Sequence, residues 1–245
     1  MFWAETYKNG ILVLEKCMFY ITGDTHRNFW RINLFCTQNK ITKDDVLIIL
    51  GDAGINYEPR YKDAELKEKL SKLPITFFCV HGNHEMRPFS LGKYTERAWN
   101  GGIAYIEAEF PSLVFAKDGE YYNLGGKSCL ALGGAYSVDK HWRTPDKDWW
   151  ADEQPSNEIK GYAEKQLALH NWQADAVLSH TCPYRYIPRE TFIKDVDQSM
   201  VDDSTERWLG DIEKRLNYNA WYCGHWHIQK TVKKLQFMYE NIKIL

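Results

Sequence analysis

The chain has 245 residues, with 31 Lys and Arg against 33 Asp and Glu, and a formal net charge of −2 at pH 7. This near-neutral balance offers no field for a polyanion, so long nucleic acid is not an expected partner. No apolar stretch approaches the roughly 20 residues that a membrane-spanning helix needs, so we do not expect a membrane partner.

Cysteine usage and the N-terminus both predict a cytoplasmic protein. The six cysteines are scattered without a CxxC pair, and several lie in apolar runs, where a thiol behaves as a small hydrophobe. Reduced, buried thiols are typical of cytosolic proteins. Residues 1–17 lack the basic segment and the long apolar run of a secretory signal.

The first half of the chain alternates apolar strands with polar-spaced helices. Residues 1–17 carry no motif and are interpreted as an extension or an added edge strand, which leaves a single domain at 18–245. The pattern then predicts, in chain order, strand 18–23, helix 28–39, strand 46–50, helix 61–72 and strand 75–80. Such alternation is typical of βαβ units with a largely parallel sheet.

From residue 101 the sequence pattern changes to short apolar runs between glycine-containing turns. Residues 101–137 therefore predict antiparallel strands, and residues 138–155 are Trp-rich, charged and irregular. The remaining pattern predicts helix 156–170, strand 174–178, helix 204–216, strand 219–223 and a final hairpin at 230–245. Mixed strands with helices at both ends favour an α/β fold in which two mixed sheets pack together, a four-layer α/β/β/α sandwich.

Five short blocks of metal-ligand side chains stand at the ends of predicted strands. They are Asp24-Thr25-His26, Gly51-Asp52-Ala53-Gly54, Gly82-Asn83-His84-Glu85, Ser179-His180 and Gly224-His225-Trp226-His227. Strand ends on one edge of a sheet lie side by side, so these blocks predict a metal centre. The D-x-H spacing puts Asp24 and His26 on one side of an extended segment, where both reach the same ion.

The order and wording of the blocks resemble the calcineurin-like metallophosphoesterases, which carry D-x-H, G-D-x-x-[DG], G-N-H-[DE], a lone His and G-H-x-H. The resemblance implies the four-layer sandwich and two divalent metal ions bridged by Asp52. It implies that Asp24, His26 and His227 bind the first ion, and that Asn83, His180 and His225 bind the second. Imidazole-rich ligation argues against Ca²⁺ or a purely Mg²⁺ site and favours Mn²⁺, Fe or Zn²⁺. Ligand softness does not choose among these three, and Mn²⁺ is the leading expectation, with Fe or Zn²⁺ as alternatives.

The resemblance also implies that His84 is not a ligand and instead faces the substrate, where it assists the leaving oxygen. A structural histidine is the alternative. Arg27 and Arg87 follow the first and third blocks, and each is either a phosphate clamp or a plain surface arginine. Glu85 is either a partner that orients a ligand or a solvated acid.

The irregular segment 136–150 is interpreted in two ways. It forms a wall over the metal site, with His141, Trp142 and Arg143 contacting the substrate, or its aromatic rings fold back as a small satellite core.

The leading functional hypothesis is a dinuclear metal-dependent phosphoesterase, in which a metal-bridging hydroxide attacks a small phosphorylated substrate. Three alternatives stay open: cleavage of a nucleotide or short oligonucleotide diester, a protein Ser/Thr phosphatase acting on a phosphoprotein, and a catalytically silent metal-binding scaffold. The block Gly-Asp-Ala-Gly-Ile-Asn lacks the acidic-basic pair of the protein phosphatases, which disfavours that alternative. All the expected ligands are present, which disfavours the scaffold.

Overall fold

The computed structural model describes residues 3–8, 11–58 and 61–245, whose strands form three sheets. β1 (Trp3–Lys8) and β2 (Ile11–Lys16) pair antiparallel with each other as a separate two-stranded sheet. Its strands extend neither of the larger sheets.

A seven-stranded sheet comes mainly from the first half of the chain, in the order β15-β3-β4-β5-β8-β7-β6. Its parallel centre consists of β3 (Phe19–Thr22), β4 (Val46–Leu50), β5 (Thr76–Val80) and β8 (Leu113–Ala116). Its antiparallel sides are β15 (Lys243–Ile244), β7 (Gly102–Glu107) and β6 (Tyr94–Trp99). Apolar runs with buried residues throughout form β4 and most of β5, as parallel central strands require.

A six-stranded sheet comes from the second half, in the order β13-β14-β12-β11-β10-β9. Its members are β9 (Tyr121–Leu124), β10 (Lys127–Leu132), β11 (Gln173–Ser179), β12 (Asn217–Cys223), β13 (Lys230–Val232) and β14 (Leu235–Phe237). The chain crosses between the sheets after β8, so the antiparallel strands predicted at 101–137 are divided between them.

Alternating side chains on the strands produce three cores. Val46, Ile48 and Leu50 of β4 face the six-stranded sheet in the central core. Leu47 and Ile49 face the opposite side, covered by α1 (Trp30–Gln38) and α2 (Tyr61–Ser71). The outer face of the six-stranded sheet packs against α3 (Asn157–Leu169) and α4 (Ser204–Arg215). The layers therefore run helix, sheet, sheet, helix, which confirms the predicted sandwich.

Two strands differ from the predicted pattern. β6 was not expected because most of its side chains are exposed and several are charged, which is typical of an edge strand. The predicted hairpin at 230–245 ends at Phe237, since Lys243 and Ile244 leave it to pair with β3 in the other sheet.

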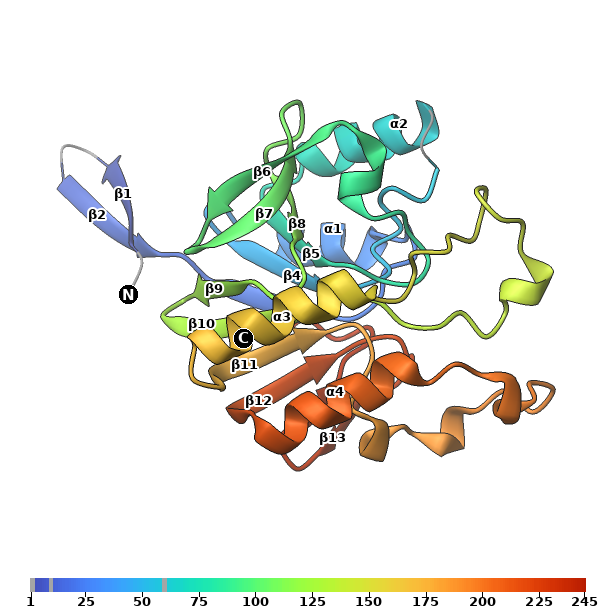
Figure 1. The fold of residues 1–245 in the computed structure, drawn as a ribbon. Coiled ribbons are helices and arrows are strands. Elements are labelled where there is room, and N and C mark those ends of the chain that lie inside the picture. Colours follow the sequence, from blue (N-terminus) through green and yellow to red (C-terminus); the bar gives the residue numbers. More distant parts are fainter. Residues whose placement is uncertain (1–2, 9–10, 59–60) are drawn as a thin grey trace.

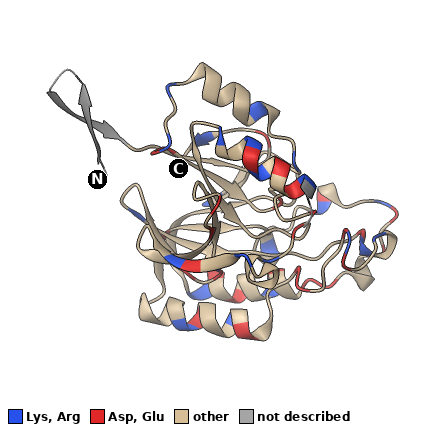
Figure 2. Ribbon diagram, turned by 90° about the horizontal axis from the view of Figure 1, so that it is seen from above, with Lys and Arg blue, Asp and Glu red and all other residues tan. Residues whose placement is uncertain are grey.

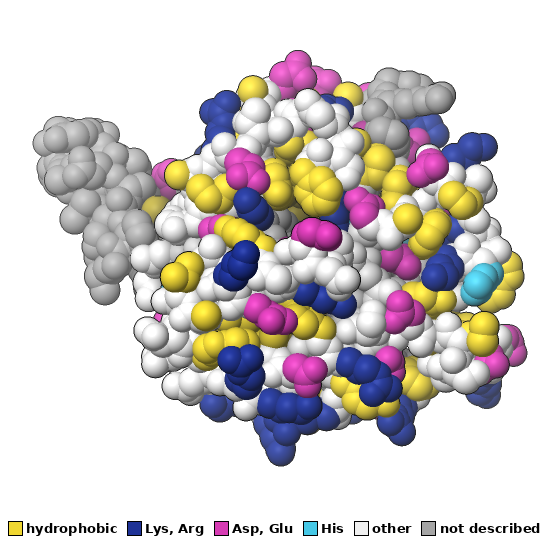
Figure 3. All heavy atoms as spheres, viewed as in Figure 1, with side chains coloured by type: hydrophobic (Ala, Val, Ile, Leu, Met, Phe, Trp, Pro, Cys, Tyr) yellow, Lys and Arg dark blue, Asp and Glu magenta, His cyan; other side chains and the backbone are white. Residues whose placement is uncertain are grey.

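Charged side chains of both signs are interspersed over the molecule. Lys and Arg alternate with Asp and Glu along the helices (Figure 2), and the face viewed in Figure 3 mixes the two signs with apolar side chains. Among the described residues, every helix is too short or too polar to span a lipid bilayer.

Candidate metal centre

The five blocks meet at one edge of the two sheets, because each follows the carboxyl end of a strand. β3, β4 and β5 of one sheet and β11 and β12 of the other end immediately before or within a block. The long segments 136–155 and 183–203 extend from this same end of the molecule (Figure 1).

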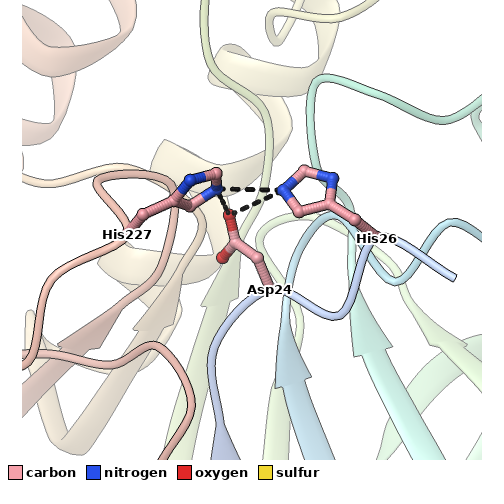
Figure 4. Close-up of side chains that lie close together, drawn as sticks. All are labelled: Asp24, His26 and His227. Carbon is pink, nitrogen blue, oxygen red and sulfur yellow. Dashed lines mark hydrogen bonds and ion pairs between the residues drawn. The ribbon is translucent and has the colours of Figure 1, made fainter. Parts of the chain in front are cut away.

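One group of candidate metal-donor atoms comes from the first and the last block. His227 Nε2 lies 3.1 Å from Asp24 Oδ2, and His26 Nε2 lies 3.7 Å from the same oxygen. The two imidazole nitrogens are 2.9 Å apart, so three donors converge on one point (Figure 4). Asp24 is buried, whereas both rings are partly exposed.

A second group lies deeper, around His180. Its Nε2 is 2.7 Å from Asn83 Oδ1 and 3.6 Å from Asp52 Oδ2. The Nδ1 of His225 is 3.0 Å from the same Asn83 oxygen. Asp24, Asp52 and His180 also present donor atoms within 4.8 Å of one another, so the two groups are contiguous.

Asp52 stands between the groups. Its Oδ2 is 3.6 Å from His180 Nε2 and 3.9 Å from His26 Nε2, while its Oδ1 accepts a hydrogen bond from the His84 backbone N–H. Burial alone would raise the pKa of this carboxyl. The nearby imidazoles of His180, His84 and His26 outweigh burial and hold the pKa well below its ordinary value.

The chemistry of the deeper donors fits a cation. The Nδ1–H of His180 donates to the Leu50 carbonyl at 2.8 Å, which leaves Nε2 as a bare lone pair when the ring is neutral. The Asn83 amide nitrogen donates to Ser137 Oγ at 2.8 Å, which turns Oδ1 toward the histidines. Acceptors that face one another at 2.7 Å repel unless a positive charge lies between them. The residues therefore fit the divalent ions that the fold implies.

The expectation of an extended D-x-H segment is wrong. His26 has φ +44° and Arg27 has φ +66°, so the block turns sharply after Thr25. The turn is held by the Asp52 carbonyl, which accepts hydrogen bonds from the backbone N–H groups of Thr25 (3.1 Å) and His26 (2.9 Å). Asp24 and His26 still converge, but through a turn rather than through strand alternation.

Two motif glycines are required by close approach of a ligand from a different block. A Cβ on Gly82 would lie 2.0 Å from Asp52 Oδ1, and a Cβ on Gly224 would lie 2.2 Å from Asp24 Oδ1. Each carboxylate thus packs directly on a neighbouring glycine backbone.

Glu85 connects two of the blocks. It is 2% exposed, and its two carboxyl oxygens accept hydrogen bonds from the backbone N–H groups of Gly82 (2.9 Å) and Gly54 (3.1 Å). Burial, followed by the nearby Asp52 carboxylate, raises its pKa well above the ordinary value. Glu85 therefore positions the turns that carry Asp52 and Asn83, one of the two roles expected for it.

His84 differs from the donors in its surroundings. Its ring lies 5.7 Å from that of His26 between centroids and lines a cavity beside the donor groups. Burial lowers the pKa of His84, whereas the Asp52 carboxylate acts in the opposite direction. Its buried Nδ1 has no hydrogen-bond partner among the described residues.

The two arginines considered as phosphate clamps contact other groups. Arg27 donates to the Gly54 carbonyl at 2.9 Å and lies 3.7 Å from Asp63. Arg87 is buried, pairs with Asp118 and donates to the Asp152 carbonyl at 2.8 Å. Neither lines the cavity beside the donor groups, whereas Arg87 lines a smaller pocket elsewhere.

The segment 136–150 only partly covers the site. Tyr136, Val138 and Asp139 line the cavity, but His141, Trp142 and Arg143 do not. Trp142 is 73% exposed, and Arg143 forms an ion pair with Asp139. The later rings fold back: Trp150 is buried and contacts Tyr57, and Trp149 donates to Glu153 at 2.7 Å.

Sequence reasoning missed the segment that supplies half of the residues lining the cavity. Residues 184–203 contain three short 3₁₀ turns, Tyr184–Tyr186, Arg189–Thr191 and Gln198–Met200, and no longer element. Their side chains face the donor groups across a cavity of about 600 Å³. The available signal was a connection of about 20 residues, rich in apolar side chains, between a ligand strand and a helix, because structureless connections of that length are uncommon.

Solved structures share this fold at low sequence identity. The crystal structure of TT1561 of Thermus thermophilus aligns with a TM-score of 0.52 and 14% identity over 94% of this chain and 98% of that chain. A further crystal structure aligns with a TM-score of 0.51 and 15% identity over 90% and 88%. A Saccharomyces cerevisiae protein serine/threonine phosphatase aligns with a TM-score of only 0.33, which supports no conclusion.

No curated protein matches the sequence. The family description of the calcineurin-like phosphoesterases, however, matches residues 18–229, a range that includes all five blocks and both donor groups. The chain belongs to the calcineurin-like phosphoesterase family.

Proposed function

We propose that this protein is a dinuclear metal-dependent phosphoesterase that hydrolyses the phosphate ester of a small compound in the cytoplasm. The observation that carries the proposal is the set of hydrogen-bond acceptors around His180. They are a bare imidazole nitrogen, an amide oxygen and a carboxylate oxygen, with no hydrogen-bond donor between them. The contiguous group at Asp24, His26 and His227 supports a second ion.

In this proposal Asp52 would help to hold both ions, since its Oδ2 is 3.9 Å from His26 Nε2 and 3.6 Å from His180 Nε2. Asp24, His26 and His227 would be the other ligands of one ion, and Asn83, His180 and His225 would be the other ligands of the second ion. This donor set favours Mn²⁺, Fe or Zn²⁺ over Ca²⁺ or Mg²⁺, because five of the seven donors are neutral and four of them are imidazoles. When bound, such ions activate a water molecule and polarise the phosphoryl oxygens.

We assign to His84 the role of assisting the departure of the leaving group. Hydrolysis forms a bond from the water oxygen to phosphorus and breaks the ester P–O bond, and the alcohol departs with a proton. His84 lines the cavity beside the donor groups, and its main-chain N–H is fixed by Asp52 at 2.9 Å. A ring nitrogen there would donate a hydrogen bond or a proton to the ester oxygen.

The proposal is tested by metal analysis together with turnover. Purified protein is loaded with Mn²⁺ and dialysed, and its metal content is measured by elemental analysis. Hydrolysis of phenyl phosphate and of diphenyl phosphate is then followed. We expect about two ions per chain and turnover of at least one of the two esters.

Asp52→Asn should lose both ions, because it weakens the one donor that they share. Asp44→Asn, at an exposed aspartate that precedes β4 at the end opposite the blocks, is the matched control and should keep the ions and the activity. Wild-type protein that binds at most one ion under metal-replete conditions, or that hydrolyses neither ester, would overturn the proposal.

A further inference from the structure

The cavity beside the donor groups is far larger than a phosphate ion requires. It measures about 600 Å³, within the range of pockets that hold small organic ligands. Asp52, Asn83 and His84 line one side of it, and residues of the segment 184–203 line the other. The space left beyond a phosphate at the metal ligands must therefore accommodate the organic part of an ester.

The wall of this space is aromatic and apolar next to the ligands. The Trp226 ring packs edge-on against the His225 ring, with centroids 5.1 Å apart. Phe192 also packs against Trp226, with centroids 6.3 Å apart and planes at 30°. Two ring contacts thus connect Phe192 through Trp226 to a candidate metal ligand. Ile187 and Val196 line the same cavity.

The charged side chains in the wall do not form a cluster of cations that would bind a second anionic group. Apart from Asp52, the lining contains three carboxyls, those of Asp139, Asp203 and Glu206, against the single guanidinium of Arg189. Asp139 and Asp203 are neutralised by ion pairs with arginines. Glu206 is 5% exposed and accepts a hydrogen bond from Thr181 Oγ1, with no cation at ion-pair distance among the described residues.

We propose that this cavity selects phosphate esters of flat, uncharged aromatic alcohols, with Phe192 and Trp226 packing against the rings of the alcohol. The inference rests on the proposed function and adds the substrate class to it. An uncharged aromatic group gains contact with the rings and the aliphatic side chains, whereas a polyphosphate or carboxylate tail would lose its hydration there with only the Arg189 guanidinium among the lining residues to compensate it.

The test compares esters that differ in size but not in leaving-group chemistry. Phenol and 4-phenylphenol have nearly equal acidity, so phenyl phosphate and 4-phenylphenyl phosphate differ mainly in the second ring. Burying that ring should raise kcat/KM about 10- to 100-fold. The analogue with a carboxylate on the second ring should lose most of this gain.

Phe192→Ala should reduce the ratio of the two kcat/KM values several-fold toward one. Phe89→Ala is the matched control: Phe89 is 53% exposed and lies outside the cavity, so the wild-type ratio should persist. Calorimetric titration of 4-phenylphenol into the metal-free protein gives a second readout, and we expect weaker binding in Phe192→Ala.

The outcomes separate the two proposals. If the metal-loaded protein hydrolyses neither these two monoesters nor diphenyl phosphate, the proposed function fails. If it hydrolyses both esters with equal kcat/KM, or if 4-phenylphenol does not bind the wild-type protein, the phosphoesterase function stands and the aromatic selectivity is overturned. An unchanged ratio in a folded Phe192→Ala protein overturns it as well.

Discussion

Replacing Glu206 with Gln should change how stability depends on pH. Burial raises the pKa of Glu206 from its ordinary 4.5 to about 7, although the Thr181 hydroxyl acts in the opposite direction. The folded protein then keeps the Glu206 proton up to about pH 7, whereas the unfolded chain releases it near 4.5. Stability therefore decreases as the pH rises from about 4.5 to about 7 and levels off above.

The magnitude follows from this difference in pKa. At about 1.4 kcal/mol for each pH unit, the difference between 4.5 and 7 lowers the free energy of unfolding by about 3 kcal/mol above pH 7. About 2–3 kcal/mol of this change falls between pH 5 and pH 8.5. Gln cannot ionise but can still accept the 2.7 Å hydrogen bond from Thr181 Oγ1, so Glu206→Gln should remove the effect.

The assay is urea unfolding of wild type and Glu206→Gln at pH 5, 6, 7 and 8.5 with the same metal content. Other titrating groups contribute to both proteins and cancel in the difference. We expect the variant to gain about 2–3 kcal/mol over wild type between pH 5 and 8.5, whereas Glu109→Gln, at an exposed position, should follow wild type. Parallel stability curves for wild type and Glu206→Gln would refute the reasoning.

Three further predictions concern the metal site and the N-terminal hairpin. His84→Ala should retain metal but lose about 10²- to 10⁴-fold in kcat, the usual contribution of a positioned acid–base group; near-wild-type rates on an alkyl ester would contradict that role. Gly82→Ala should lose metal on elemental analysis, because its Cβ would lie 2.0 Å from Asp52 Oδ1, whereas Gly161→Ala on α3, whose Cβ meets nothing within 4 Å, should keep it. Removing residues 1–17 should leave turnover intact, since β1 and β2 form a sheet of their own, and a folded but inactive truncation would disprove this.

The layered fold could be predicted because its strands are marked by composition. The run VLIIL at 46–50 is buried at every position, as a central parallel strand must be. The polar β6 carries no such mark, and the pairing of Lys243 and Ile244 with β3 depends on how the chain is placed in space. Local pattern cannot supply that information.

The candidate ligands could be predicted as a set because strand ends converge whatever the loops do. The directions of long side chains could not. Arg87 follows a motif block in sequence, yet its guanidinium turns away to Asp118 and leaves the donor groups to other residues. The cavity wall at 184–203 was missed for a related reason: its residues lie in short 3₁₀ turns with no period that indicates which side faces the metal site.

The ligand positions depend on the backbone of neighbouring blocks more than on their own strands. Four of the seven candidate ligands have a left-handed backbone: His26, Asp52, His225 and His227, with φ between +44° and +64°. Each such residue costs about 1–2 kcal/mol, so the conformation persists only where other contacts hold it. Those contacts cross between blocks, because the Asp52 carbonyl binds the first turn and Asp24 Oδ1 accepts the His225 N–H at 2.9 Å. The donors are therefore held in place by the network of turns, and a change in one block should disturb ligands in another.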